Sequence, residues 1–116
     1  TERICWHREL NNLKSRPKAY NYAMEFEWDE DKSEACFQQR GFDFAYAAQV
    51  FFDPDRTVQL DTRRDYGEER YQLYGRIEGR LYVVVCTLRS DVIRIISARK
   101  ANQREIQRHE NSTPQD

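Results

Sequence analysis

The residues best suited to chemistry lie in the stretch DVIRIISARKANQRE, from Asp91 to Glu105. Its β-branched residues favour a strand, and alternation would place Arg99 on one face with Ile93 and Ile95, and Arg94 on the other. Arg99 would then end the strand and bring to the rim of a sheet a planar guanidinium that can hold a phosphate through two parallel hydrogen bonds. The alternative is a core strand followed by a solvated basic helix, with Arg99 in a structural ion pair.

Other acidic and basic side chains could meet this strand on one sheet: Lys32, Glu68, Glu69, Arg70, Arg76 and Arg94. Metal-free RNA cleavage needs a base that takes the 2′-hydroxyl proton, a cation that stabilises the charged transition state, and an acid for the leaving 5′-oxygen. Arginine suits the second role but is a poor base, because it stays protonated near neutral pH. Composition allows this chemistry without selecting it.

Several other kinds of chemistry find no support in the sequence. The three cysteines form no CxxC pair, His7 and His109 lie at opposite ends, and there is no P-loop or HExxH motif. The acids between residues 53 and 69 follow no ligand spacing, so we expect neither a metal nor a cofactor. With no secretory signal and no apolar run near 18 residues, we expect a cytoplasmic protein without a membrane span.

Length and composition indicate one globular domain: 116 residues, 39% hydrophobic and 34% charged, with a net charge of −1. Residues 1–23 are basic and poorly patterned, and we expect an N-terminal extension there. A well-patterned domain should occupy residues 24–110, beginning at Met24, and residues 111–116 should form a flexible tail. Six basic and two acidic residues between Arg89 and Arg108 leave a local positive charge that could meet a polyanion.

The periodicity predicts an α+β fold with an antiparallel sheet of about four strands. Helix caps are expected at Asp29 and Asp43, with a C-terminal glycine at Gly41, and Glu78-Gly79 should form a tight hairpin. The expected order is a short strand at 25–28, helices at 29–40 and 43–53, strands at 56–60, 70–77, 81–88 and 92–99, and a helix at 101–110.

A set of short motifs in fixed order resembles one known family. The motifs are Phe26-Glu27-Trp28-Asp29 with Lys32, Gly41 and Phe44; Gly67-Glu68-Glu69-Arg70-Tyr71; Gly75-Arg76; and Arg94 through Ala101 with Arg104-Glu105. Together they resemble the BrnT toxins of BrnT/BrnA type II toxin–antitoxin modules, from Met24 to about Glu110. The resemblance implies a RelE-like fold, ribonuclease activity that arrests translation, and a BrnA antitoxin that binds both the toxin and operator DNA.

Residues and resemblance together predict a metal-independent endoribonuclease that forms a hetero-oligomer with a BrnA-like antitoxin and meets operator DNA only through it. The predicted catalytic residues are Arg99, Arg70, Glu69 and Glu68. The predicted RNA-binding residues are Lys32, Arg76, Arg94, Lys100 and Arg104.

The chain departs from the family pattern at three positions. Gln39-Arg40-Gly41 stands where members often have Lys-His-Gly, Cys86 where many have His, and His109 where Tyr is frequent. If either missing imidazole is an acid or base in the family, another residue must act here or activity is weak. The alternative function is therefore a non-catalytic module that binds the antitoxin or RNA.

Overall fold

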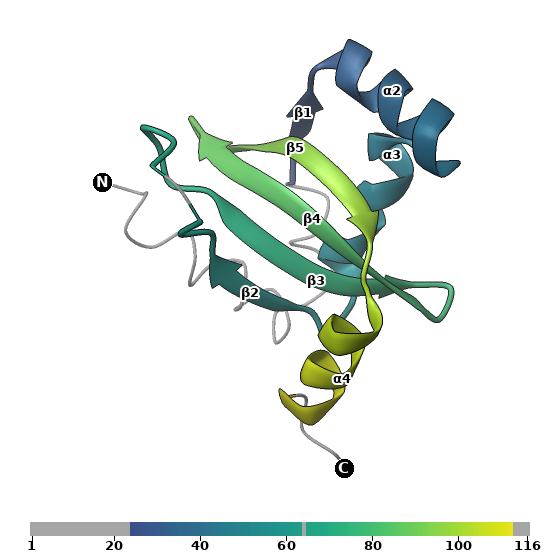
Figure 1. The fold of residues 1–116 in the computed structure, drawn as a ribbon. Helices are drawn as coiled ribbons and strands as arrows, with labels where there is room; N and C mark the ends of the chain where they lie inside the picture. The colour runs from purple at the N-terminus through teal and green to yellow at the C-terminus, as the bar shows by residue number, and fades with distance from the viewer. Residues whose placement is uncertain (1–23, 64, 113–116) are drawn as a thin grey trace.

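The computed structural model describes residues 24–63 and 65–112, which form one mixed sheet with helices on both of its faces (Figure 1). The predicted extension at residues 1–23 and the end of the predicted tail, residues 113–116, lie outside the described residues. The elements are β1 (Phe26–Trp28), α2 (Glu30–Arg40), α3 (Phe44–Ala47), the 3₁₀ helix η2 (Ala48–Phe52), β2 (Thr57–Leu60), β3 (Tyr71–Ile77), β4 (Arg80–Arg89), β5 (Val92–Lys100) and α4 (Gln103–Ser112).

The sheet has the strand order β1-β5-β4-β3-β2. Strands β2 to β5 pair antiparallel, which confirms the α+β class and the antiparallel arrangement expected for residues 56–99. The sequence predicts about four strands, but the described sheet has five and is mixed, because β1 joins the free edge of β5 in parallel. This pairing includes a 2.9 Å hydrogen bond from the Ile93 N–H to the Glu25 carbonyl.

The predicted caps of the first helix are confirmed. The Asp29 carboxylate accepts hydrogen bonds from the Asp31 and Lys32 amides at 2.8 and 3.3 Å. Gly41 ends the helix with φ +87°, a left-handed conformation that glycine adopts without a Cβ penalty. These two residues set both ends of α2, which packs against β5.

The second helix is also capped as predicted, by Asp43, whose carboxylate accepts the Tyr46 N–H at 2.9 Å. It does not continue as one α-helix, because the chain tightens into η2 after Ala47. The change in pitch buries Val50 completely and leaves Ala48 half-buried.

Two tight hairpins order the antiparallel strands. Glu78 and Gly79 both have positive φ, 52° and 83°, as a two-residue turn of this handedness requires. Ser90 and Asp91 adopt the same conformation without glycine, with φ of 51° and 69°. The second turn connects β4 to β5 and so sets the register that positions the arginines described below.

The main core lies on the face of the sheet covered by α2, α3 and η2. It contains Phe44, Phe51 and Val50 from the helices and Leu73, Val84 and Ile95 from the strands. A smaller cluster on the other face places Tyr74, Leu81 and Val83 against Ala101 and Ile106 of the α4 region. No helix of the described residues is long and apolar enough to cross a bilayer.

Candidate active site

The alternation of β5 is interrupted at Ile96. Val85 and Cys86 are consecutive in β4, but their partners in β5 are Ser97 and Ile95. Ile96 is therefore an extra residue in β5 without a partner in β4. This irregularity is a β-bulge. A bulge inverts the alternation of every residue that follows it.

As a result, Arg94 and Arg99 lie on the same face of the sheet. Arg94 pairs with Thr87 and Arg99 with Val83, and these two β4 residues are four apart, so their side chains share a face. The prediction that the arginines lie on opposite faces is wrong, and so is the prediction that Arg99 shares a face with the buried isoleucines of β5. The physical reason is the bulge.

This face, opposite α2, α3 and η2, is here called the polar face. Strand register assigns to it Gln59, Gln72, Thr87, Arg94, Ser97 and Arg99. One end is covered by α4 through Ile106. The other end carries the group of charges described next.

Three arginines, here called the arginine cluster, gather there: Arg70, Arg89 and Arg94. Glu68 lies between the first two, with Oε2 3.5 Å from Arg70 Nε and 3.4 Å from Arg89 Nη2. Arg94 Nη1 lies 3.3 Å from Glu27 Oε2 on β1, a salt bridge between neighbouring strands. Three positive charges thus face two carboxylates.

Thr87 lies in the middle of the arginine cluster. Arg70 precedes Tyr71, the partner of Cys86, so alternation aligns Arg70 with Thr87 on one side, while Arg94 flanks it on the other. Two strand spacings put the Cα atoms of Arg70 and Arg94 about 10 Å apart. The Thr87 hydroxyl donates to the Glu69 carbonyl at 2.6 Å, which ties the segment before β3 to β4.

The Arg70 side chain is held from two sides. Its guanidinium carbon lies 4.1 Å from the centre of the Tyr66 ring, a cation–π contact. Its ion pair with Glu68 is long and is not a hydrogen bond, and the side chain is 24% exposed. Arg70 is thus oriented by a ring while part of it still faces solvent.

Arg99 forms a structural ion pair, the role expected from the sequence as the alternative to phosphate binding. Its two terminal nitrogens donate to both carboxylate oxygens of Glu105, each at 2.8 Å. Hydrogen bonding from Arg99 lowers the pKa of Glu105 to about 2. The Arg99 side chain remains 39% exposed, so a phosphate could reach it only beside the carboxylate that it already binds.

The remaining predicted residues do not converge on one place. Glu69 turns its carboxylate to the Tyr71 hydroxyl, which donates at 2.8 Å, and Arg76 lies 3.4 Å from Glu110 of α4. The other three are exposed cations on different parts of the surface: Lys32 on α2, Lys100 at the end of β5 and Arg104 on α4. Of the predicted site residues, the structure therefore brings together Glu68, Arg70 and Arg94.

The departures from the family pattern have clear structural settings. Cys86 is fully buried, and burial raises the pKa of its thiol to about 12, so it cannot exchange protons near neutral pH. His109 is 3% exposed, with Nδ1 3.3 Å from the Thr57 hydroxyl oxygen, and burial lowers the pKa of its imidazole. Arg40 is exposed beside a pocket on the helix side.

Sequence reasoning missed Arg89 as a member of the arginine cluster. Its position is encoded by the tight turn that follows it, because a two-residue hairpin at Ser90-Asp91 pairs Arg89 with Val92 and puts it two residues from Thr87 on the same face. It also did not predict the ion pair of Arg63, whose Nε and Nη2 donate to the two carboxylate oxygens of Asp61, each at 2.8 Å. Among the described residues, no group of three or more His, Cys, Asp or Glu is placed to hold a metal.

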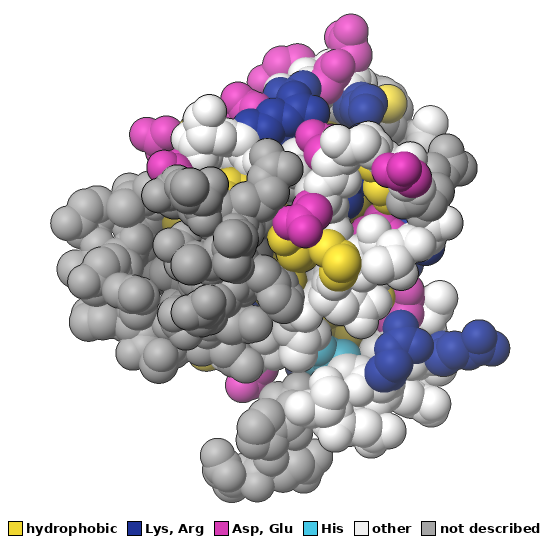
Figure 2. All heavy atoms as spheres, turned by 90° about the vertical axis from the view of Figure 1, so that its left-hand side faces the viewer, with side chains coloured by type: hydrophobic (Ala, Val, Ile, Leu, Met, Phe, Trp, Pro, Cys, Tyr) yellow, Lys and Arg dark blue, Asp and Glu magenta, His cyan; other side chains and the backbone are white. Residues whose placement is uncertain are grey.

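Charge on one side of the molecule is mixed. On the side seen in Figure 2, lysine and arginine side chains gather at the top and at the lower right, with acidic side chains beside the upper group. The described surface in this view has no single basic patch, in keeping with the net charge of −1. Any polyanion would therefore be bound through local geometry more than through a long-range field.

A small α+β domain with arginines and glutamates on an open sheet face has the groups that act on phosphodiesters. Residues 28–105 match the family described as ribonuclease toxin, BrnT, of type II toxin–antitoxin system. Since the match spans more than half of the chain, the protein belongs to the BrnT family and is a ribonuclease toxin of a type II module. No curated protein matches the sequence.

Proposed function

We propose that this toxin is an endoribonuclease that cleaves RNA on the polar face, without a metal ion, and thereby arrests translation. The observation that carries the proposal is the arginine cluster around Thr87, with Glu68 between two of its guanidinium groups. A scissile phosphate in this position would meet several arginines at once. Arginine forks match phosphate geometry and stay charged at every physiological pH.

Each group then has a role. Glu68 takes the proton from the 2′-hydroxyl, the 2′-oxygen bonds to phosphorus to form a 2′,3′-cyclic phosphate, and the 5′-oxygen leaves and takes up a proton from water. Arg70 and Arg94 stabilise the negative charge that develops on the phosphoryl oxygens. Arg89 holds Glu68 in place from its other side. Arg99 lies five residues further along β5, roughly 13 Å from Arg94 with the bulge counted, and is a candidate for a phosphate further along the RNA.

The partner follows from the family. A type II toxin has a protein antitoxin, and we propose a BrnA-like, DNA-binding one that forms a hetero-oligomer with this chain and links it to operator DNA. We expect the neighbouring reading frame to encode it and the two proteins to copurify. Co-expression that yields only free toxin would contradict the partner proposal.

The direct test is cleavage of a defined RNA by the purified protein in EDTA. Wild type should cleave, and Arg70→Ala and Arg94→Ala should each lose about 10²–10³-fold in rate, the effect of removing one preorganised charge donor. Arg99→Ala is included because the sequence singles it out. Arg108→Ala, which removes an exposed arginine of α4, is the matched control and should cleave like wild type.

One observation favours a second function. The only histidine among the described residues is buried, and the position often held by His in the central strand is an inert cysteine. A chain without an acid/base pair would bind RNA or antitoxin without cutting. Binding of RNA by wild type with no cleavage in EDTA or in Mg²⁺ would select this alternative.

A further inference from the structure

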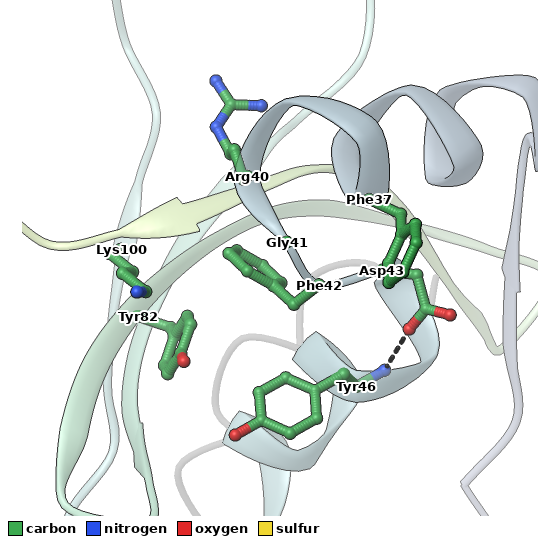
Figure 3. Close-up of a pocket in the computed structure, with 8 residues that line it drawn as sticks. All are labelled: Phe37, Arg40, Gly41, Phe42, Asp43, Tyr46, Tyr82 and Lys100. Atoms are coloured by element: carbon green, nitrogen blue, oxygen red, sulfur yellow. Dashed lines mark hydrogen bonds between the residues drawn. The ribbon is translucent and has the colours of Figure 1, made fainter.

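A second candidate site lies on the other side of the sheet from the polar face. A cavity of about 430 Å³ opens between the end of α2, α3 and the ends of β4 and β5 (Figure 3). That volume is within the range of small-molecule pockets, about 300–1,000 Å³. The residues used below are Phe37, Arg40, Phe42, Tyr46, Tyr82 and Lys100.

Three aromatic rings form a fixed floor. Tyr82 meets Phe42 edge to face at 5.0 Å and Tyr46 at 5.9 Å, which are favoured geometries for ring pairs. The Tyr46 hydroxyl donates to Glu78 Oε1 at 2.9 Å, and this bond raises the pKa of Tyr46 to about 12. These contacts hold the three rings against one another, and the Tyr46 phenol stays neutral near pH 7.

The rim of the cavity differs from its floor, because the rim side chains are exposed to solvent. Phe37 is 50% exposed, although most large apolar side chains of the described residues are buried. Arg40 and Lys100 are exposed, and within the described part of the chain neither lies within 4 Å of a carboxylate, unlike the arginine cluster. The rim acid, Asp43, is engaged as the cap of α3.

The end of β5 connects this rim to the polar face. Lys100 pairs with Tyr82 and Arg99 with Val83, so the two consecutive cations project to opposite faces of the sheet. A strand of RNA that leaves the polar face at Arg99 would need only to cross the edge of one β-strand to reach Lys100.

We propose that this cavity is an accessory subsite for single-stranded RNA, in which a base stacks on Phe37 and flanking phosphates meet Arg40 and Lys100. Exposed aromatic rings and unpaired cations are the groups by which proteins hold unstacked nucleotides. An acidic peptide would use the cations but would leave the exposed ring unexplained. The inference rests on the proposed ribonuclease function, since it supplies that same reaction with a second point of contact.

The test separates binding from cleavage by using a 2′-O-methyl hexanucleotide, which lacks the nucleophile and cannot be cut. Fluorescence anisotropy with the full-length toxin should show that Phe37→Ala weakens binding by at least about fivefold, the lower end for loss of one base stack. Arg40→Gln and Lys100→Gln should each reduce the slope of log affinity against log salt by about 0.7, the value for one phosphate on a single strand.

Matched controls exist on the same chain. Phe52→Ala removes another exposed phenylalanine, 45% exposed, and Arg108→Gln another exposed cation; neither should change affinity or slope. With cleavable RNA, the three subsite variants should raise KM for long substrates by a larger factor than KM for a dinucleotide, which is too short to span the polar face and the subsite.

Three results would overturn the inference. They are unchanged RNA affinity in all three subsite variants, loss of antitoxin binding with RNA affinity intact, and no binding of the hexanucleotide by wild type. Binding that depends on Phe37 with no cleavage of unmodified RNA would instead reject the proposed catalysis and keep the subsite.

Discussion

Glu105 binds Arg99 through two contacts of 2.8 Å, and its Oε1 atom also accepts the Asn102 N–H at 2.9 Å. In a second hydrogen bond, the Glu105 N–H donates to the side-chain oxygen of Asn102 at 2.8 Å. These reciprocal bonds form a capping box at the start of α4. The arginine that the sequence singles out for catalysis therefore also fastens the end of β5 to the helix that follows.

This ion pair predicts a stability loss in acid. Arg99 lowers the pKa of Glu105 from 4.5 to about 2. Because the folded pKa lies below the unfolded one, the stabilisation is fully present above pH 4.5 and is lost as the pH falls toward 2. We expect about 1–2 kcal/mol, less than full linkage, because solvent screens the partly exposed Arg99.

Urea unfolding of wild type and Glu105→Gln at pH 7 and pH 3 measures this contribution. The difference in unfolding free energy between the two proteins should shrink at pH 3, while acids elsewhere affect both proteins alike. An equal difference at both pH values would show that the charge of Glu105 contributes nothing.

The same ion pair predicts that replacing Arg99 changes stability as well as activity. A solvated arginine at the rim would lose activity on replacement with a near-normal Tm, but Arg99→Ala should also lower Tm by about 3–6 °C, since about 1 kcal/mol shifts a domain of this size by that amount. If Arg99 contacts a phosphate, the rate falls by about 10²–10³-fold as well. Arg99→Lys should restore part of the Tm and part of the cleavage rate, because lysine supplies the positive charge without the two-pronged guanidinium.

Calorimetry and cleavage rates on the same preparations separate the two roles. A lower Tm with an unchanged rate in Arg99→Ala would assign Arg99 to structure alone. A lost rate with an unchanged Tm would show that the pair with Glu105 adds no stability.

Local signals in the sequence predict much of this fold. Asp29, Gly41 and Asp43 define helix ends because capping depends only on nearby backbone groups. The Glu78-Gly79 hairpin is equally local. The four antiparallel strands follow from these signals and from alternation.

The features that sequence reasoning missed depend on contacts between distant segments. The bulge at Ile96 leaves no mark in a run of β-branched residues, yet it decides which face Arg99 occupies. The parallel pairing of β1 with β5 joins residues more than sixty positions apart. The candidate site was predicted in part: Glu68, Arg70 and Arg94 converge, whereas the place of Arg89 follows only from the second hairpin.

Gly75 is predicted to be required by the packing of β3 against η2. A Cβ at this position would lie 2.7 Å from the Val50 carbonyl oxygen and 2.9 Å from the Val50 Cβ. Because backbone atoms cannot move aside easily, Gly75→Ala should cost about 1–3 kcal/mol of unfolding free energy. Chemical denaturation measures the effect.

The control for Gly75 is Gly67→Ala, where a Cβ meets nothing within 4 Å and only the positive φ of +77° is strained. It should cost about 1 kcal/mol. A smaller loss at Gly75 than at Gly67 would mean that η2 can withdraw from β3.

Cys86 is predicted to be unreactive in the folded protein. It is fully buried and its thiol pKa is raised to about 12, so almost no thiolate is present at pH 8. Iodoacetamide at pH 8 should label Cys86 only after denaturation, as read by peptide mass mapping. Rapid labelling under native conditions would reveal opening of the sheet at β4.

The last prediction separates catalysis from structure in the arginine cluster. Arg94 Nη1 and Glu27 Oε2 lie 3.3 Å apart, and both side chains are partly exposed, so the pair should contribute only about 0–1 kcal/mol to folding. Arg94→Gln and Glu27→Gln should therefore have similar, small effects on Tm. Their effects on RNA cleavage should differ. Arg94→Gln removes a charge from the proposed transition state and should slow cleavage by about 10²–10³-fold.

Glu27→Gln removes an anion that competes with phosphate for the same guanidinium, so its rate should equal or exceed that of wild type. Single-turnover cleavage in EDTA, with Tm recorded for each protein, makes the comparison. Equal rates for the two variants, with equal losses of Tm, would assign the pair to the joint between β1 and β5 and remove Arg94 from the cleavage site.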